Sequence, residues 1–114
     1  MAGRERPTVT KEEAEERFLQ LIRAAGFPDP RRQVMLYDQS VDAYWPDSRF
    51  AVEVDSIMWH TNKSKFKRDR RKEQILKDHG IELSHTYWDQ ITTEPLELVA
   101  HLAFQLGVRL SRAA

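Results

Sequence analysis

Acidic residues inserted into strand-like segments of residues 40–60 constrain the fold more than any other feature of the sequence. The segment 49–55 (RFAVEVD) alternates apolar residues with Glu53 and Asp55, so a strand here places both acids on one face. Asp42 lies in the preceding strand-like segment, and a Pro-Asp-Ser turn separates the two. If these segments pair as a hairpin, the acids converge at one edge of a sheet. Like charges held that close require a cation or a shared proton.

Length and charge exclude several classes of protein. The chain has 114 residues, with 18 basic and 18 acidic side chains and no cysteine. This length fits one domain with a modest core. Because the charges balance, a nucleic-acid partner must be argued from the local charge distribution. The lack of cysteine removes disulfides and thiolate metal sites. No apolar run approaches membrane-spanning length, so we expect a soluble, cytoplasmic protein without a membrane partner.

Hydrophobic periodicity predicts an α/β (α+β) domain in the order α-β-β-β-α-β-α, with a mixed central sheet of about four strands flanked by helices. The expected helices span 10–25, 64–79 and 93–110, and the expected strands span 33–37, 40–45, 49–55 and 81–87. Short connections favour an antiparallel meander for the first three strands, and the helix before the fourth lets that strand lie parallel. Residues 1–8 are expected to be flexible, and residues 9–110 to form the single domain.

The first expected helix carries one acid on its buried side. Thr10 and Glu13 fit a capping box at its start, and Gly26 follows its end. At about 100° per residue, Glu15 falls within roughly 20° of Ile22, which belongs to the apolar stripe, so Glu15 points inward. The alternative is a boundary residue whose carboxylate reaches solvent.

The second expected helix is unusually rich in charge. Ile75 and Leu76 define its buried side, and Arg68, Asp69 and Lys72 lie on that side one or two turns earlier. Burying charge without a purpose is costly, so these residues suggest a functional role. Basic residues line the opposite side and its margin, and we call them the basic stripe: Lys63, Lys67, Arg70 and Arg71. The alternative interpretation of the basic stripe is an ordinary solvated helix face.

Carboxylates from two neighbouring strands are suitable ligands for magnesium. Mg²⁺ takes hard oxygen ligands and keeps several waters, so Asp42, Glu53 and Asp55 would suffice to bind it. Such a site can activate water for phosphodiester hydrolysis. His60 follows a few residues later, as a further ligand or a general base. The alternative is that the acids lie on a solvated strand face.

The motifs resemble the small nuclease domains related to very short patch repair (Vsr) endonucleases, within the wider PD-(D/E)xK restriction-endonuclease-like superfamily. The resemblance covers roughly residues 15–102 and rests on AEERFLQLIRAAGFPDP, VDAYWPDSRFAVEVDSIMWH and FKRDRRKEQILKDHGIEL. It implies a restriction-endonuclease-like fold and a DNA endonuclease acting in nicking, DNA repair, restriction or defence. The implied cofactor is Mg²⁺, with Mn²⁺ as a substitute, and the implied partner is DNA.

Carried over by position, the resemblance implies a role for each motif residue. It assigns the catalytic site to Asp42, Glu53, Asp55, His60 and Glu15. The first three of these would bind the metal. Asp69 and Lys72 would hold the neighbouring site residues in place. The basic stripe would contact the DNA backbone through its cationic side chains.

Departures from the family pattern favour alternative hypotheses. The superfamily's usual motif lysine is here Asp55, as is common in this branch of the superfamily. Three other departures are the ones that count: Ser56 replaces a favoured glycine, and Lys72 and His85 stand where arginine is expected. A catalytically inactive nuclease-like DNA-binding or assembly subunit is therefore the second hypothesis. A small protein-interaction module that uses its tryptophans as anchors is the third. A domain this small would gain sequence specificity from a homodimer or from a protein partner.

Overall fold

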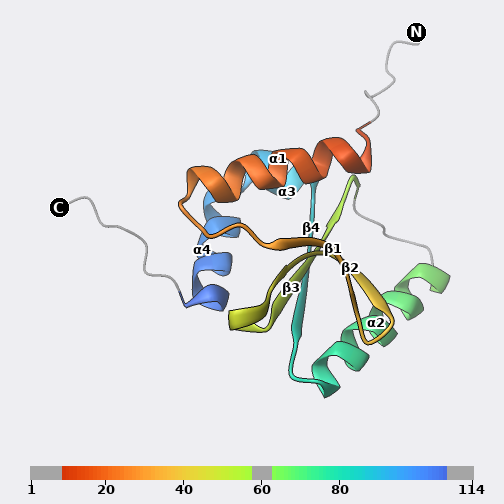
Figure 1. Ribbon diagram of the computed structural model, residues 1–114. Coiled ribbons are helices and arrows are strands. Elements are labelled where there is room, and N and C mark those ends of the chain that lie inside the picture. The colour runs from red at the N-terminus through yellow and green to blue at the C-terminus, as the bar shows by residue number, and fades with distance from the viewer. Residues whose placement is uncertain (1–8, 58–62, 108–114) are drawn as a thin grey trace, which may run out of the picture.

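The computed structural model describes residues 9–57 and 63–107 and has a mixed α/β fold (Figure 1). Its elements are α1 (Lys11–Ala24), β1 (Arg31–Leu36), β2 (Gln39–Trp45), the 3-10 turn η1 (Pro46–Ser48), β3 (Phe50–Asp55), α2 (Lys63–Asp78), β4 (Glu82–Tyr87), α3 (Trp88–Thr93) and α4 (Pro95–Leu106). The expected order is confirmed with one addition, the short helix α3. The expectation that residues 1–8 are flexible lies outside the described residues.

A single four-stranded mixed sheet runs through the molecule in the order β1-β2-β3-β4. The β1–β2 and β2–β3 pairs are antiparallel, and β3–β4 is parallel. Tyr37 and Asp38 connect β1 to β2 with φ of 51° and 66°, the left-handed geometry of a tight two-residue hairpin turn. Parallel pairing of β3 with β4 requires a crossover, and α2 provides it.

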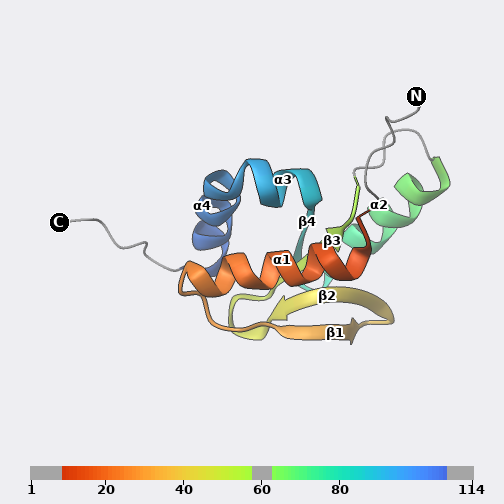
Figure 2. The same cartoon turned by 90° about the horizontal axis from the view of Figure 1, so that it is seen from above.

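Helices cover the two faces of the sheet unequally. Figures 1 and 2 show α1, α3 and α4 on one side of the sheet and α2 alone on the other. The larger core joins Phe50, Val52 and Val54 of β3 to the buried stripes of α1 and α4. The smaller core places Leu76 of α2 against Leu83 of β4 and their neighbours. Because consecutive strand residues face opposite sides, β3 contributes to both cores and carries its acids on the α2 side.

Helix boundaries follow local chemistry. Thr10 caps α1 through the predicted capping box with Glu13. The expected helix 93–110 begins instead at Pro95, which suits the first helical turn because it lacks an N–H. Residues 88–92, expected as a short connection, belong to α3. Within the described residues, no helix is long and apolar enough to cross a membrane.

Candidate functional site

The site forms where β2 and β3 separate. The ladder between them pairs Ala43 with Val52 and continues toward Trp45, so it ends just before Asp42. The Asp42 side chain is only 8% exposed, and its Oδ2 accepts a hydrogen bond of 2.7 Å from the backbone N–H of Val54. This bond takes the place of the next ladder contact and fixes the carboxylate against β3. Asp42 therefore lies beside the residue that separates Glu53 from Asp55.

Lys11, the first residue of α1, places its ammonium among oxygens of this site. Its Nζ lies 2.7 Å from Asp42 Oδ2, 2.6 Å from the carbonyl oxygen of Val54 and 3.4 Å from Glu15 Oε2. Figures 1 and 2 show the N-terminal end of α1 beside the end of β3. Burial lowers the pKa of Lys11, but the neighbouring carboxylates, Asp42 foremost, outweigh it and raise the pKa above its ordinary value. The ammonium is therefore charged at neutral pH.

Glu15 points inward, as its helical position predicted. Its side chain is 16% exposed, and its Oε1 accepts a hydrogen bond of 3.1 Å from Gln33 Nε2. The same amide nitrogen lies 3.4 Å from Asp42 Oδ1. Gln33 therefore links the acid of α1 to the acid of β2. The sequence reasoning missed Gln33, which the β1–β2 ladder leaves without a partner between Arg32 and Val34, opposite Asp42.

Glu53 is partnered from the opposite side of the sheet. The Lys72 ammonium of α2 forms an ion pair with Glu53 Oε2 and donates to the carbonyl oxygen of Ser40 at 2.7 Å. Burial raises the pKa of Glu53, and the Asp42 carboxylate raises it further, against the opposing effect of Lys72. Lys72 thus contacts a predicted site acid directly.

Asp55 forms an ion pair with His85 on the neighbouring strand. His85 Nδ1 lies 3.9 Å from Asp55 Oδ2. Burial raises the pKa of Asp55, but His85, Lys65 and Lys11 outweigh it and the pKa is lowered overall. The Asp55 carboxylate raises the pKa of His85, and this effect exceeds the opposing effect of burial. His85 therefore carries more positive charge near neutral pH than an ordinary histidine.

The N-terminal part of α2 is largely exposed. Every residue of the basic stripe is exposed, as predicted. Arg68 is exposed too, so its expected place on the buried side of the helix is wrong. The reason is that α2 has one fully buried residue, Leu76, near its C-terminal end, and the sheet does not cover its first turns. Asp69 is partly buried and pairs with Lys65 at 3.4 Å.

The predicted acids lie near one another, but cations already accompany them. Among residues 9–57 and 63–107, no three aspartate, glutamate or histidine side chains form a group that could hold a metal ion. Asp42 and Glu53 instead each contact a lysine ammonium. His60 lies outside the described residues. Binding of a metal by Asp42, Glu53 and Asp55 therefore stays a prediction.

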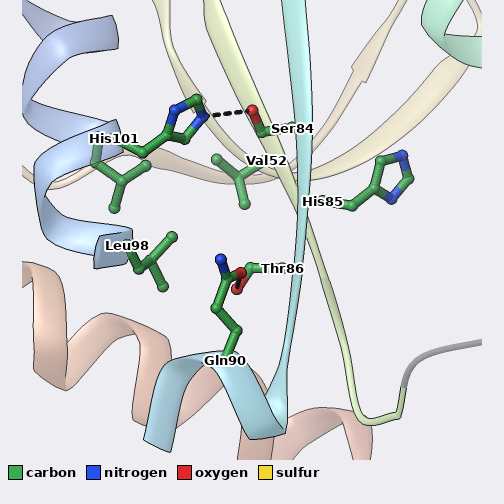
Figure 3. A pocket seen from close by; sticks show the side chains of 8 residues that line it. Val52, Ser84, His85, Thr86, Gln90, Leu98 and His101 are labelled. Carbon is green, nitrogen blue, oxygen red and sulfur yellow. Dashed lines mark hydrogen bonds between the residues drawn. The ribbon is translucent and has the colours of Figure 1, made fainter. Parts of the chain in front are cut away.

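A separate pocket of about 260 Å³ opens on the α4 side of the sheet (Figure 3). Ser84 of β4 lies 3.0 Å from His101 Nε2 of α4, and Thr86 donates to the side-chain oxygen of Gln90. Because Ser84 and Thr86 alternate with His85 along β4, this pocket lies across the sheet from Glu53 and Asp55. The sequence reasoning did not identify it.

Sequence comparisons match the chain to two proteins of unknown function. No family model matches the chain. Two uncharacterized proteins of Mycobacterium tuberculosis, from strains CDC 1551 and H37Rv, are each 31% identical over 86 residues. This match covers 71% of the chain but only 32% of each relative, so the chain spans about a third of their length.

A solved structure gives a match over most of the chain. The catalytic domain of the homing endonuclease I-Bth0305I superposes with a TM-score of 0.67. The match covers 85% of this chain and 93% of that domain at 15% identity. The mixed four-stranded sheet flanked by helices is therefore a fold that this chain shares with an endonuclease catalytic domain.

Proposed function

We propose that the chain is a metal-dependent endonuclease that hydrolyses DNA phosphodiester bonds. The observation that carries the proposal is the Asp42 carboxylate, anchored to the Val54 N–H where β2 and β3 separate, with Glu15 and Glu53 beside it. The fold shared with a homing endonuclease catalytic domain supports a nuclease. The resemblance of the motifs to Vsr-like endonucleases supports the same reaction, in DNA repair, restriction or defence.

The donor chemistry fits Mg²⁺, or Mn²⁺ in its place. Asp42, Glu15 and the Val54 carbonyl already surround one cationic nitrogen with hard oxygen atoms, the ligand type that Mg²⁺ prefers. Asp42, Glu53 and Asp55 are the proposed metal ligands. A bound metal would polarise the scissile phosphate and lower the pKa of a water molecule.

The remaining residues have proposed roles that follow from their contacts or, for His60, from the motif resemblance. Lys72 opposes the effect of burial on Glu53 and favours its ionised, ligand-competent form. His85 pairs with Asp55 and restrains that carboxylate. His60 would orient or deprotonate the attacking water. The exposed basic stripe would bind the phosphate backbone of DNA.

Nicking of a supercoiled plasmid in the presence of Mg²⁺ tests the proposal. The variants are Asp42→Asn, Glu53→Gln and the double variant, each checked for folding by circular dichroism. Asn at position 42 keeps an oxygen acceptor for the Val54 N–H but loses the negative charge. We expect each single variant to lose about 10²-fold or more in rate. Asp29→Asn is the control, because Asp29 is 60% exposed and pairs with Arg23 at the other end of α1. Cleavage that persists in the double variant would overturn the mechanism.

A second candidate function is DNA binding or assembly without cleavage. The observation that favours it is that Lys11 and Lys72 already compensate Asp42 and Glu53. The departures from the family pattern at Ser56, Lys72 and His85 also favour a protein that does not cleave DNA. This candidate predicts that the wild-type protein binds DNA while neither Mg²⁺ nor Mn²⁺ produces nicking. In either case, a homodimer or a protein partner would supply sequence specificity.

A further inference from the structure

We infer that the ammonium of Lys11 is a built-in cation at Asp42, an acid of the proposed metal site, so that a metal can bind Asp42 only when Lys11 withdraws. This inference rests on the proposed function, because it concerns the same acids. It adds a residue and a competition that the motif resemblance does not include.

The contacts of Lys11 are those expected for a cation in an oxygen-lined site. Its three oxygen neighbours come from three elements, with Asp42 on β2, Val54 on β3 and Glu15 on α1. Two of these contacts are direct hydrogen bonds to a carboxylate and to a main-chain carbonyl. A divalent ion bound to the same Asp42 oxygen would lie close to the ammonium. The repulsion between two cations at that distance excludes simultaneous occupancy.

Lys11 can leave this position without rearrangement of the fold. Its side chain is 46% exposed and extends from the first residue of α1 on a flexible four-carbon stem. The hydrogen bonds of Thr10 with Glu13 hold the helix start independently of the lysine side chain. Withdrawal therefore needs only rotation of the Lys11 side chain into solvent.

Lys72, the other lysine at the site, is not suited to the same exchange. Its side chain is 17% exposed, and it is held by the Ser40 carbonyl as well as by Glu53. Lys11 makes the same two kinds of contact, so the difference between the two lysines lies in exposure, which is 46% for Lys11 and 17% for Lys72. The geometry thus separates a displaceable ammonium at Asp42 from a fixed ammonium at Glu53.

The competition has a measurable consequence. When a site is accessible in only a fraction of the molecules, the apparent affinity for its ligand falls by that fraction. If Lys11 occupies the site in about nine molecules of ten, its removal raises the metal affinity about tenfold. The ammonium also relieves the repulsion between Asp42 and Glu15 when no metal is bound, so its removal destabilises the metal-free protein.

Calorimetric titration of Mg²⁺ and Mn²⁺ into wild type, Lys11→Met and Lys11→Arg tests the inference. We expect Lys11→Met to bind metal about tenfold more tightly than wild type and Lys11→Arg to stay close to wild type. Arg23→Met is the matched control, because it removes one positive charge from the far end of α1, where Arg23 is 53% exposed. In thermal unfolding, Lys11→Met should be less stable than wild type without metal and should gain more stability from Mg²⁺. If the Met variant does not fold without metal, Lys11→Gln replaces it.

The outcomes separate this inference from the proposed function. Tighter binding by Lys11→Met than by both wild type and Arg23→Met supports the competition, including the case in which only Lys11→Met binds. Equal binding by wild type and Lys11→Met overturns the competition and leaves the nuclease proposal intact. If neither binds metal, the proposed metal site itself is wrong, and the inference is overturned with it.

Discussion

The side-chain nitrogen of Gln33 lies 3.4 Å from Oδ1 of Asp42, across the β1–β2 hairpin. The ladder pairs Arg32 with Ala43 and Val34 with Val41 but omits the position between them. Gln33 there has φ of 52°, a left-handed conformation that is costly for a residue with a side chain. The residue with the strained backbone is therefore also the one whose side-chain amide contacts Glu15 and Asp42.

Substitution of Gln33 should separate its backbone effect from its side-chain effect. Gln33→Gly and Gln33→Ala both remove the amide, but only glycine tolerates the left-handed conformation. We expect the glycine variant to be more stable than the alanine variant by about 1 kcal/mol in urea unfolding. We expect both to lose about tenfold in metal affinity, because Glu15 and Asp42 lose a common donor. An alanine variant as stable as the glycine variant would show that the backbone strain is absent.

Sequence periodicity correctly predicted on which face of its own helix or strand a side chain lies. The alternation in residues 49–55 placed Glu53 and Asp55 on one face of β3, and helical spacing placed Glu15 inward. Lys11 and Gln33 were missed because their contacts join residues far apart in the chain or across a hairpin. Periodicity predicts which face a side chain occupies, but it does not identify the element opposite that face.

The same limit explains the error at Arg68. Helical spacing put this residue on the side of Leu76, but the sheet covers only the C-terminal part of α2. The position of a helix end relative to a sheet edge depends on the lengths of the connections and of the strands. A pattern within the helix does not encode it.

The ion pair of Lys72 with Glu53 should make stability depend on pH in a defined direction. Burial and Asp42 raise the folded-state pKa of Glu53 above 4.5, so ionised Glu53 opposes folding as pH rises through that range. The Lys72 ammonium lowers the pKa of Glu53, so Lys72→Met should raise that pKa further. We expect the variant to lose about 1–3 kcal/mol of unfolding free energy at neutral pH. The loss should shrink near pH 4, about where a glutamate becomes protonated.

Urea unfolding of wild type and Lys72→Met at both pH values measures this difference. Lys67→Met is the control, because Lys67 is exposed on the same helix, and it should change stability little at either pH. An equal loss at both pH values would assign the effect to packing of the Lys72 stem, and the charge argument would fail.

The basic stripe of α2 should determine how DNA binding depends on salt. Its four cationic side chains are exposed on a helix whose first turns lie clear of the sheet (Figure 1). Each phosphate contact contributes about 0.9 to the slope of log affinity against log salt concentration, because counterions are released from DNA. We therefore expect Lys67→Gln with Arg71→Gln to reduce that slope by up to about 2 and to weaken binding to all sequences alike. Fluorescence anisotropy with a short duplex in EDTA measures it without cleavage. Arg23→Gln is the control, and a double variant that keeps the wild-type slope would place the DNA interface on another surface.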